Sequence, residues 1–140
     1  TVTQEATINP THRDARVVQQ FLTTGLIISI RSPITTLDSI VDGYVKLGQG
    51  ERDSIRLATT RPDDYLVLDD YLAFTIASRF GVRPILLLDF LLQLFERKEL
   101  DKEVVVNIVE SIAPRYSPPF VAHTLAKLKA IDDDTNHNQG

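Results

Sequence analysis

Three acidic residues in the middle of the chain have the type and spacing of ligands for a divalent metal ion. Asp69 and Asp70 directly follow the apolar run Tyr65–Leu68, and Glu51 directly follows the segment Gly48-Gln49-Gly50. Mg²⁺ and Mn²⁺ prefer oxygen ligands, which carboxylates from different elements supply when they converge. The metal-ligand hypothesis therefore rests on Glu51, Asp69 and Asp70.

The two aspartates follow a segment that is expected to be a buried strand. Tyr65–Leu68 has no alternation of polar and apolar residues, which is typical of a strand covered on both faces in a parallel α/β sheet. Ligands of open α/β sheets bind just beyond the carboxyl ends of such strands. Asp69 and Asp70 stand at that place in the sequence.

Glu51 belongs to a predicted helix that begins near Gly50. Residues four and seven positions apart share a face of a helix, so Glu51 lies on the same face as the apolar residues Ile55 and Ala58. This spacing predicts an inward-leaning carboxylate on the first helical turn.

Helix capping is a second explanation of the same acids. An acid in the first turn of a helix complements the helix dipole, which would account for Glu51. Aspartate is a preferred N-cap residue, so Asp69 or Asp70 could cap the helix that follows the strand. The sequence leaves both the metal and the capping interpretation open.

Two arginines lie four residues apart on one face of the predicted Glu51 helix. The chain has a net charge of -4 and a pI of about 5.3, unlike the basic domains typical of dedicated nucleic-acid binders. A local basic strip formed by Arg52 and Arg56 could still contact phosphates. The alternative is a solvated helix face.

The segments LGQGERDSIRLA and YLVLDDYLAFTIASRFGVRPI resemble PIN-domain proteins, in a branch similar to VapC toxins. This resemblance implies a ribonuclease that depends on Mg²⁺ or Mn²⁺, often the toxin of a toxin–antitoxin pair with RNA as substrate. Carried over by position, Glu51 and Asp70 match the family's catalytic acids, and Asp69 is a neighbouring metal ligand. An antitoxin protein and a second copy of the chain are the partners that the resemblance implies.

The chain departs from the family pattern at two places. No strand ending in aspartate precedes Thr1, and Leu86 and Leu87 occupy the place of the family's last acid, with Asp89 as the nearest carboxylate. Because a two-metal site needs several carboxylates, a catalytically incomplete interaction or oligomerisation module is the alternative function. The family's first strand would lie beside Tyr65–Leu68, so we expect that edge to be covered by residues outside this sequence, by a partner chain or by Thr1–Glu5.

The composition fits one domain with a hydrophobic core. The chain has 140 residues, of which 43% are hydrophobic, and the sequence predicts a single domain over residues 1–131 followed by a disordered polar tail over 132–140. It contains no cysteine and no apolar run long enough to cross a bilayer, which is compatible with a cytoplasmic protein. It also contains no methionine, so we expect a fragment or truncated form of a longer chain.

Strand-like and helix-like segments alternate along the chain, which predicts an α/β fold, a three-layer α/β/α sandwich around a mostly parallel sheet with a helical C-terminal extension. The periodicities predict a helix over Thr11–Thr24 that ends at Gly25, strands at Leu26–Ile30 and Val82–Ile85, and three C-terminal helices that begin near Leu87, Asp101 and Pro118.

Overall fold

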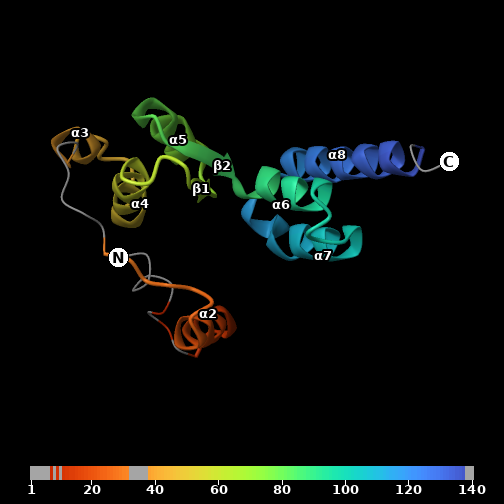
Figure 1. Ribbon diagram of the computed structural model, residues 1–140, viewed down its shortest axis with the longest axis horizontal. Helices are drawn as coiled ribbons and strands as arrows, with labels where there is room; N and C mark the ends of the chain where they lie inside the picture. Colours follow the sequence, from red (N-terminus) through yellow and green to blue (C-terminus); the bar gives the residue numbers. More distant parts are fainter. Residues whose placement is uncertain (1–6, 8, 10, 32–37, 138–140) are drawn as a thin grey trace. The chain divides into compact units, whose positions relative to one another are not determined.

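A computed structural model describes residues 7, 9, 11–31 and 38–137 of the chain (Figure 1). In chain order, the elements in this part are α2 (Arg13–Thr24), α3 (Asp38–Asp42), α4 (Gln49–Thr59), β1 (Tyr65–Leu68), α5 (Tyr71–Ala77), η1 (Ser78–Phe80), β2 (Arg83–Leu86), α6 (Leu87–Glu96), α7 (Lys102–Ile112), η2 (Ala113–Arg115) and α8 (Pro118–His137). The predicted helix at Gly50 and the predicted strand at Tyr65–Leu68 are both confirmed.

The chain divides into two compact units, Thr1–Pro84 and Ile85–Gly140, and the division falls inside β2. The first unit has its own hydrophobic core, to which α3, α4, β1 and α5 contribute. The buried members of this core are Val41, Leu47, Ile55, Leu68, Ala73, Ile76, Ala77 and Val82. The prediction of one domain over residues 1–131 stays a prediction.

Strands β1 and β2 pair in a parallel sheet, with α5 and η1 between them in the sequence. Parallel strands need a crossover connection, which here contains helix α5. The mixed α/β fold with a parallel sheet and a helical C-terminal part is therefore confirmed.

The prediction that β1 is covered on both faces is wrong. Leu66 and Leu68 pack in the core, whereas Tyr65 and Val67 on the other face are exposed. Successive side chains of a strand point to opposite faces, and α4 and α5, which both contact β1, cover only the Leu66 and Leu68 face among the described residues. The expectation that Thr1–Glu5 covers the edge of β1 falls outside the described residues.

The segment Leu26–Ile30 is irregular, so the strand predicted there is wrong. Helix α2 ends at Gly25 as predicted, because this glycine adopts a left-handed conformation (φ 75°). Leu26 and Ile28 are mostly exposed. A β-branched, apolar sequence forms a strand only when another strand accepts its backbone hydrogen bonds and a neighbour covers its side chains.

The second unit contains helices α6, α7 and α8, which all contact one another. Its core consists of the buried residues Leu88, Leu91, Leu92, Val105, Val109 and Leu128. The predicted starts of all three helices are confirmed: α6 begins at Leu87, α7 follows Asp101, and α8 has Pro118 as its first residue.

Helix α8 continues to His137, so residues 132–137 are helical where the sequence predicts a disordered tail. The cost of helix formation lies mainly in its first turn, and each later residue adds one hydrogen bond. A polar segment that would not form a helix alone can therefore extend one that is already packed. No helix in the described ranges has the length and apolarity to cross a membrane.

Candidate acidic site

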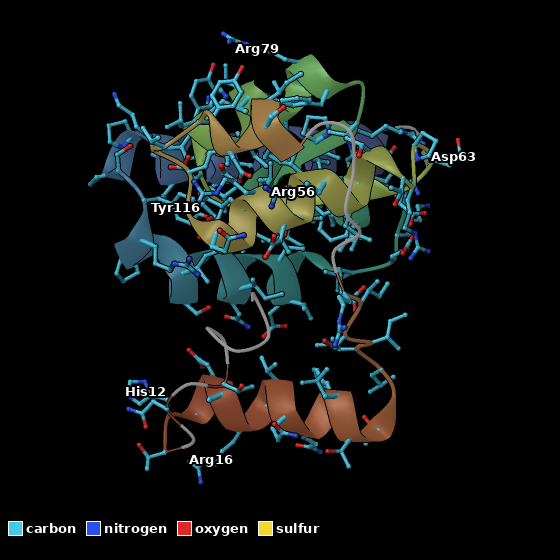
Figure 2. All side chains as sticks on the ribbon, turned by 90° about the vertical axis from the view of Figure 1, so that its left-hand side faces the viewer. His12, Arg16, Arg56, Asp63, Arg79 and Tyr116 are labelled. Atoms are coloured by element: carbon cyan, nitrogen blue, oxygen red, sulfur yellow. The ribbon has the colours of Figure 1, made fainter. Side chains whose placement is uncertain are left out.

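The helix that carries Glu51 packs against the strand that Asp69 and Asp70 follow. Helix α4 ends at Thr59 and β1 begins at Tyr65, and the two elements are in contact. A connection this short between packed elements reverses the direction of the chain. Asp63, in this connection, lies at one end of α4 (Figure 2), and Glu51 is on the first turn, at the opposite end of the helix.

The Glu51 carboxylate is held by the backbone at the N-terminus of its own helix. The Gly48 N–H donates a hydrogen bond to Glu51 Oε2, with 2.7 Å between the two atoms. This is the return half of a capping box, in which the third residue of a helix accepts from the N-cap backbone. It satisfies a donor that would otherwise lack a partner at the helix start.

Asp70 is the N-cap of α5. The Ala73 N–H donates to Asp70 Oδ1 at 2.8 Å, and Asp70 has the extended backbone conformation of an N-cap residue. Of the two explanations that the sequence left open, capping therefore accounts for the observed contacts of both Glu51 and Asp70.

The structure does not gather the three predicted ligands around one point. In the part of the chain that the structure describes, no group of three histidine, cysteine or acidic side chains could hold a metal ion. The donor chemistry of Glu51, Asp69 and Asp70 suits Mg²⁺ or Mn²⁺, but their arrangement does not fit a bound ion. Asp89, the nearest acid to the family's last position, lies in the first turn of α6, in the second unit.

Arg56 is buried in an ion-pair network that the sequence did not reveal. Its side chain is only 8% exposed; Nη1 donates to Asp53 Oδ1 at 2.9 Å, and Nη2 donates to Asp42 Oδ1. The interpretation of this helix face as solvated is therefore wrong for Arg56, whose guanidinium is occupied by two carboxylates. The three-residue spacing to Asp53 could have indicated the first pair, but Asp42 lies fourteen residues away.

Arg52 lies at the edge of the same network. Its Nη2 donates to Gln49 Oε1 at 3.1 Å, and its Nε is 3.9 Å from Asp42 Oδ1. Its side chain is 20% exposed. A role of Arg52 or Arg56 in phosphate binding stays a prediction, and the observed role of both residues is to connect α4 to Asp42 at the end of α3.

Amide substitutions separate the capping role of the two acids from their charge. Asparagine is as good an N-cap as aspartate, and glutamine can replace glutamate in a capping box. We therefore expect Asp70→Asn and Glu51→Gln to leave the free energy of unfolding nearly unchanged, and Asp70→Ala to lower it by about 1 kcal/mol. Urea denaturation followed by circular dichroism measures this.

A matched control for the cap is Asp101→Ala. Asp101 is the N-cap residue of α7, but its side chain makes no capping hydrogen bond. Its replacement should cost clearly less stability than Asp70→Ala. Equal losses at Asp70 and Asp101 would contradict a specific capping role for Asp70.

Comparison with known proteins gives one family. The family model DUF3368, described as a PIN domain, matches residues 1–130 of the 140. No curated protein and no solved structure matches the chain. The match spans both compact units and all three acids of the candidate site.

Proposed function

Because this chain belongs to the PIN-domain family, we propose that it is a ribonuclease of the PIN type, dependent on Mg²⁺ or Mn²⁺. Glu51 and Asp70 are its catalytic acids, and both hold the metal together with Asp69. The observation that supports the proposal is that α4, which carries Glu51 in its first turn, packs against β1, the strand that Asp69 and Asp70 follow. Carboxylates are therefore available at the end of a parallel strand, where α/β sheets bind ligands.

Metal binding on these residues requires a change in the arrangement described above. Glu51 Oε2 and Asp70 Oδ1 each accept a backbone hydrogen bond at a helix start. A carboxylate has two oxygens and several acceptor positions, so each acid can turn toward a cation while its other oxygen keeps the cap. The proposal therefore requires the Glu51 and Asp70 side chains to move toward a shared cation while both helix caps are kept.

The physiological setting that we propose is the cytoplasm, where the chain acts on RNA as the toxin of a toxin–antitoxin pair. Its protein partners in this setting are an antitoxin and a second copy of the chain. These assignments follow from the resemblance to VapC-like PIN proteins.

One observation favours a second candidate function. Glu51 and Asp70, which match the family's catalytic pair, both accept capping hydrogen bonds at helix N-termini. Together with Asp69 they form no group of three acids that could hold a metal ion. These contacts support a PIN-like interaction or oligomerisation module without nuclease activity, in which the acids are retained for stability.

Calorimetric titration with Mn²⁺ separates the two candidates. For a metal-dependent ribonuclease, we expect the unchanged chain to bind Mn²⁺, and Asp70→Asn and Glu51→Gln each to weaken the binding at least about tenfold, because loss of one charged ligand costs more than 1.4 kcal/mol. Both variants should also abolish cleavage of a labelled RNA that requires Mn²⁺ and stops on addition of EDTA. Asp101→Asn serves as the control for removal of one negative charge outside the site.

The same titration contradicts the ribonuclease if the unchanged chain and both amide variants bind Mn²⁺ equally weakly and none of them cleaves RNA. Because the amide variants are expected to keep their caps, a loss of binding cannot be attributed to unfolding. The unfolding curves of each variant check this directly.

A further inference from the structure

The first unit contains a pocket whose lining includes none of the three acids. It has a volume of about 320 Å³ and is formed by the segment 43–46, between α3 and α4, and by one face of α5 and η1. Leu72, Ile76 and Arg79 follow one another along that face at helical spacing. The pocket is therefore a short groove along two turns of helix.

The lining of the groove is apolar with cations at its rim. Its floor includes Ile76, which belongs to the core, and Tyr44, whose ring makes an edge contact with Phe80. Lys46 and Arg79 are its charged lining residues, and none of the described residues that line it is acidic. Arg79 extends outward into solvent (Figure 2). The groove is thus locally positive on a chain with a net charge of -4.

Two of the apolar residues that line the groove are themselves exposed. Val45 is 82% exposed and Leu72 is 41% exposed, and both line the groove. Ile40 on α3 and Tyr71 at the start of α5, each next to a lining segment, are also exposed. Apolar patches rimmed by polar residues mark binding surfaces. Because Val45 and Leu72 in its lining are exposed, the groove is open and fits a protein segment better than an enclosed small molecule.

We propose that this groove binds an acidic, amphipathic helix of a partner protein. The apolar side chains of that helix, at positions i, i+3, i+4 and i+7, would contact Leu72 and Ile76 in the groove. Its acidic side chains would pair with Lys46 and Arg79 at the rim. This proposal uses none of the three acids and is independent of the proposed ribonuclease activity.

Charge decides between this partner and a second copy of the same chain. In a two-fold symmetric dimer the same patch meets itself, so the cations Lys46 and Arg79 would face a groove whose described lining carries the same two cations and no acid. Like charges across an interface suppress association. A partner whose charge is opposite to that of the rim is therefore favoured.

The test uses two designed peptide helices with the same leucines at i, i+3, i+4 and i+7. One carries glutamates at the flanking positions and the other carries lysines. We expect the acidic peptide to bind at least about tenfold more tightly than the basic peptide in fluorescence anisotropy, because two ion pairs are exchanged for two repulsions. Amide shifts in ¹⁵N NMR spectra should concentrate at residues 43–46 and 72–79.

Two variants and one control locate the binding. Lys46→Glu combined with Arg79→Glu should invert the preference for the two peptides, and Thr75→Trp, at a residue that lines the groove, should weaken binding of both. Lys127→Glu, on the exposed side of α8, should change neither. Equal binding of the two peptides, or amide shifts confined to other residues, would overturn the proposal. So would a dimer in sedimentation that Thr75→Trp dissociates, because the occupant would then be a second copy.

Discussion

Replacing Leu88 by alanine is expected to lower the free energy of unfolding by about 3–4 kcal/mol, a typical cost for truncation of a fully buried leucine. Leu88 is 1% exposed and lies in the core of the three C-terminal helices. The substitution removes buried apolar surface and leaves a cavity that packed helices fill only in part. Urea denaturation followed by circular dichroism measures the loss.

Val104→Ala is the matched control for this substitution. Val104 lies on α7 in the same unit, but it is 42% exposed. Its truncation should change the free energy of unfolding by about 0.5 kcal/mol or less, as is usual for surface substitutions. Comparable losses for Leu88→Ala and Val104→Ala would contradict the assignment of the core.

The companion substitution Ile55→Ala tests the predicted extent of the domain. Ile55 is fully buried in the core of the first unit. If residues 1–131 form one cooperative domain, Ile55→Ala and Leu88→Ala will each shift one common unfolding transition. If the units unfold independently, each substitution will shift a transition of its own and leave the other in place.

Replacing Arg56 by alanine is expected to lower the free energy of unfolding by about 2–3 kcal/mol. Removing one partner of a buried ion pair is strongly destabilising, since the other partner loses its counter-charge. The expected cost is below the roughly 3–5 kcal/mol typical of a fully buried pair, because the Asp42 side chain is 56% exposed and water can solvate it after the change. Arg56→Met, which keeps most of the buried aliphatic volume, should be less destabilising than Arg56→Ala.

A double-mutant cycle of Arg56→Met with Asp42→Asn isolates the interaction between α4 and the end of α3. The residues are hydrogen-bonded, so the two effects should be non-additive by about 1 kcal/mol or more. Arg52→Met provides the comparison, because Arg52 Nε is 3.9 Å from Asp42. Additive effects for Arg56 and Asp42 would show that their ion pair contributes no stability.

Local patterns were sufficient to predict most elements. The run Tyr65–Leu68, the helical spacing after Gly50 and the left-handed glycine at position 25 each depend on residues within one or two turns. Two of the incorrect expectations, a strand at Leu26–Ile30 and disorder over 132–137, concern segments in which the local sequence preference is weak evidence for the structure. A strand needs a partner, and a helix end needs only the helix before it.

The sequence by itself determined which groups are available to this protein: carboxylates at a helix start and a strand end, and a membership of the PIN-domain family that the family match confirms. Only the tertiary structure decided what those groups contact. In the folded chain, Glu51 and Asp70 accept hydrogen bonds at helix N-termini. Arg56 is buried and donates to Asp42, whereas Tyr65 and Val67 are exposed. The physical reason is that burial and charge pairing depend on residues that are distant in sequence, and periodicity within one element carries no information about them.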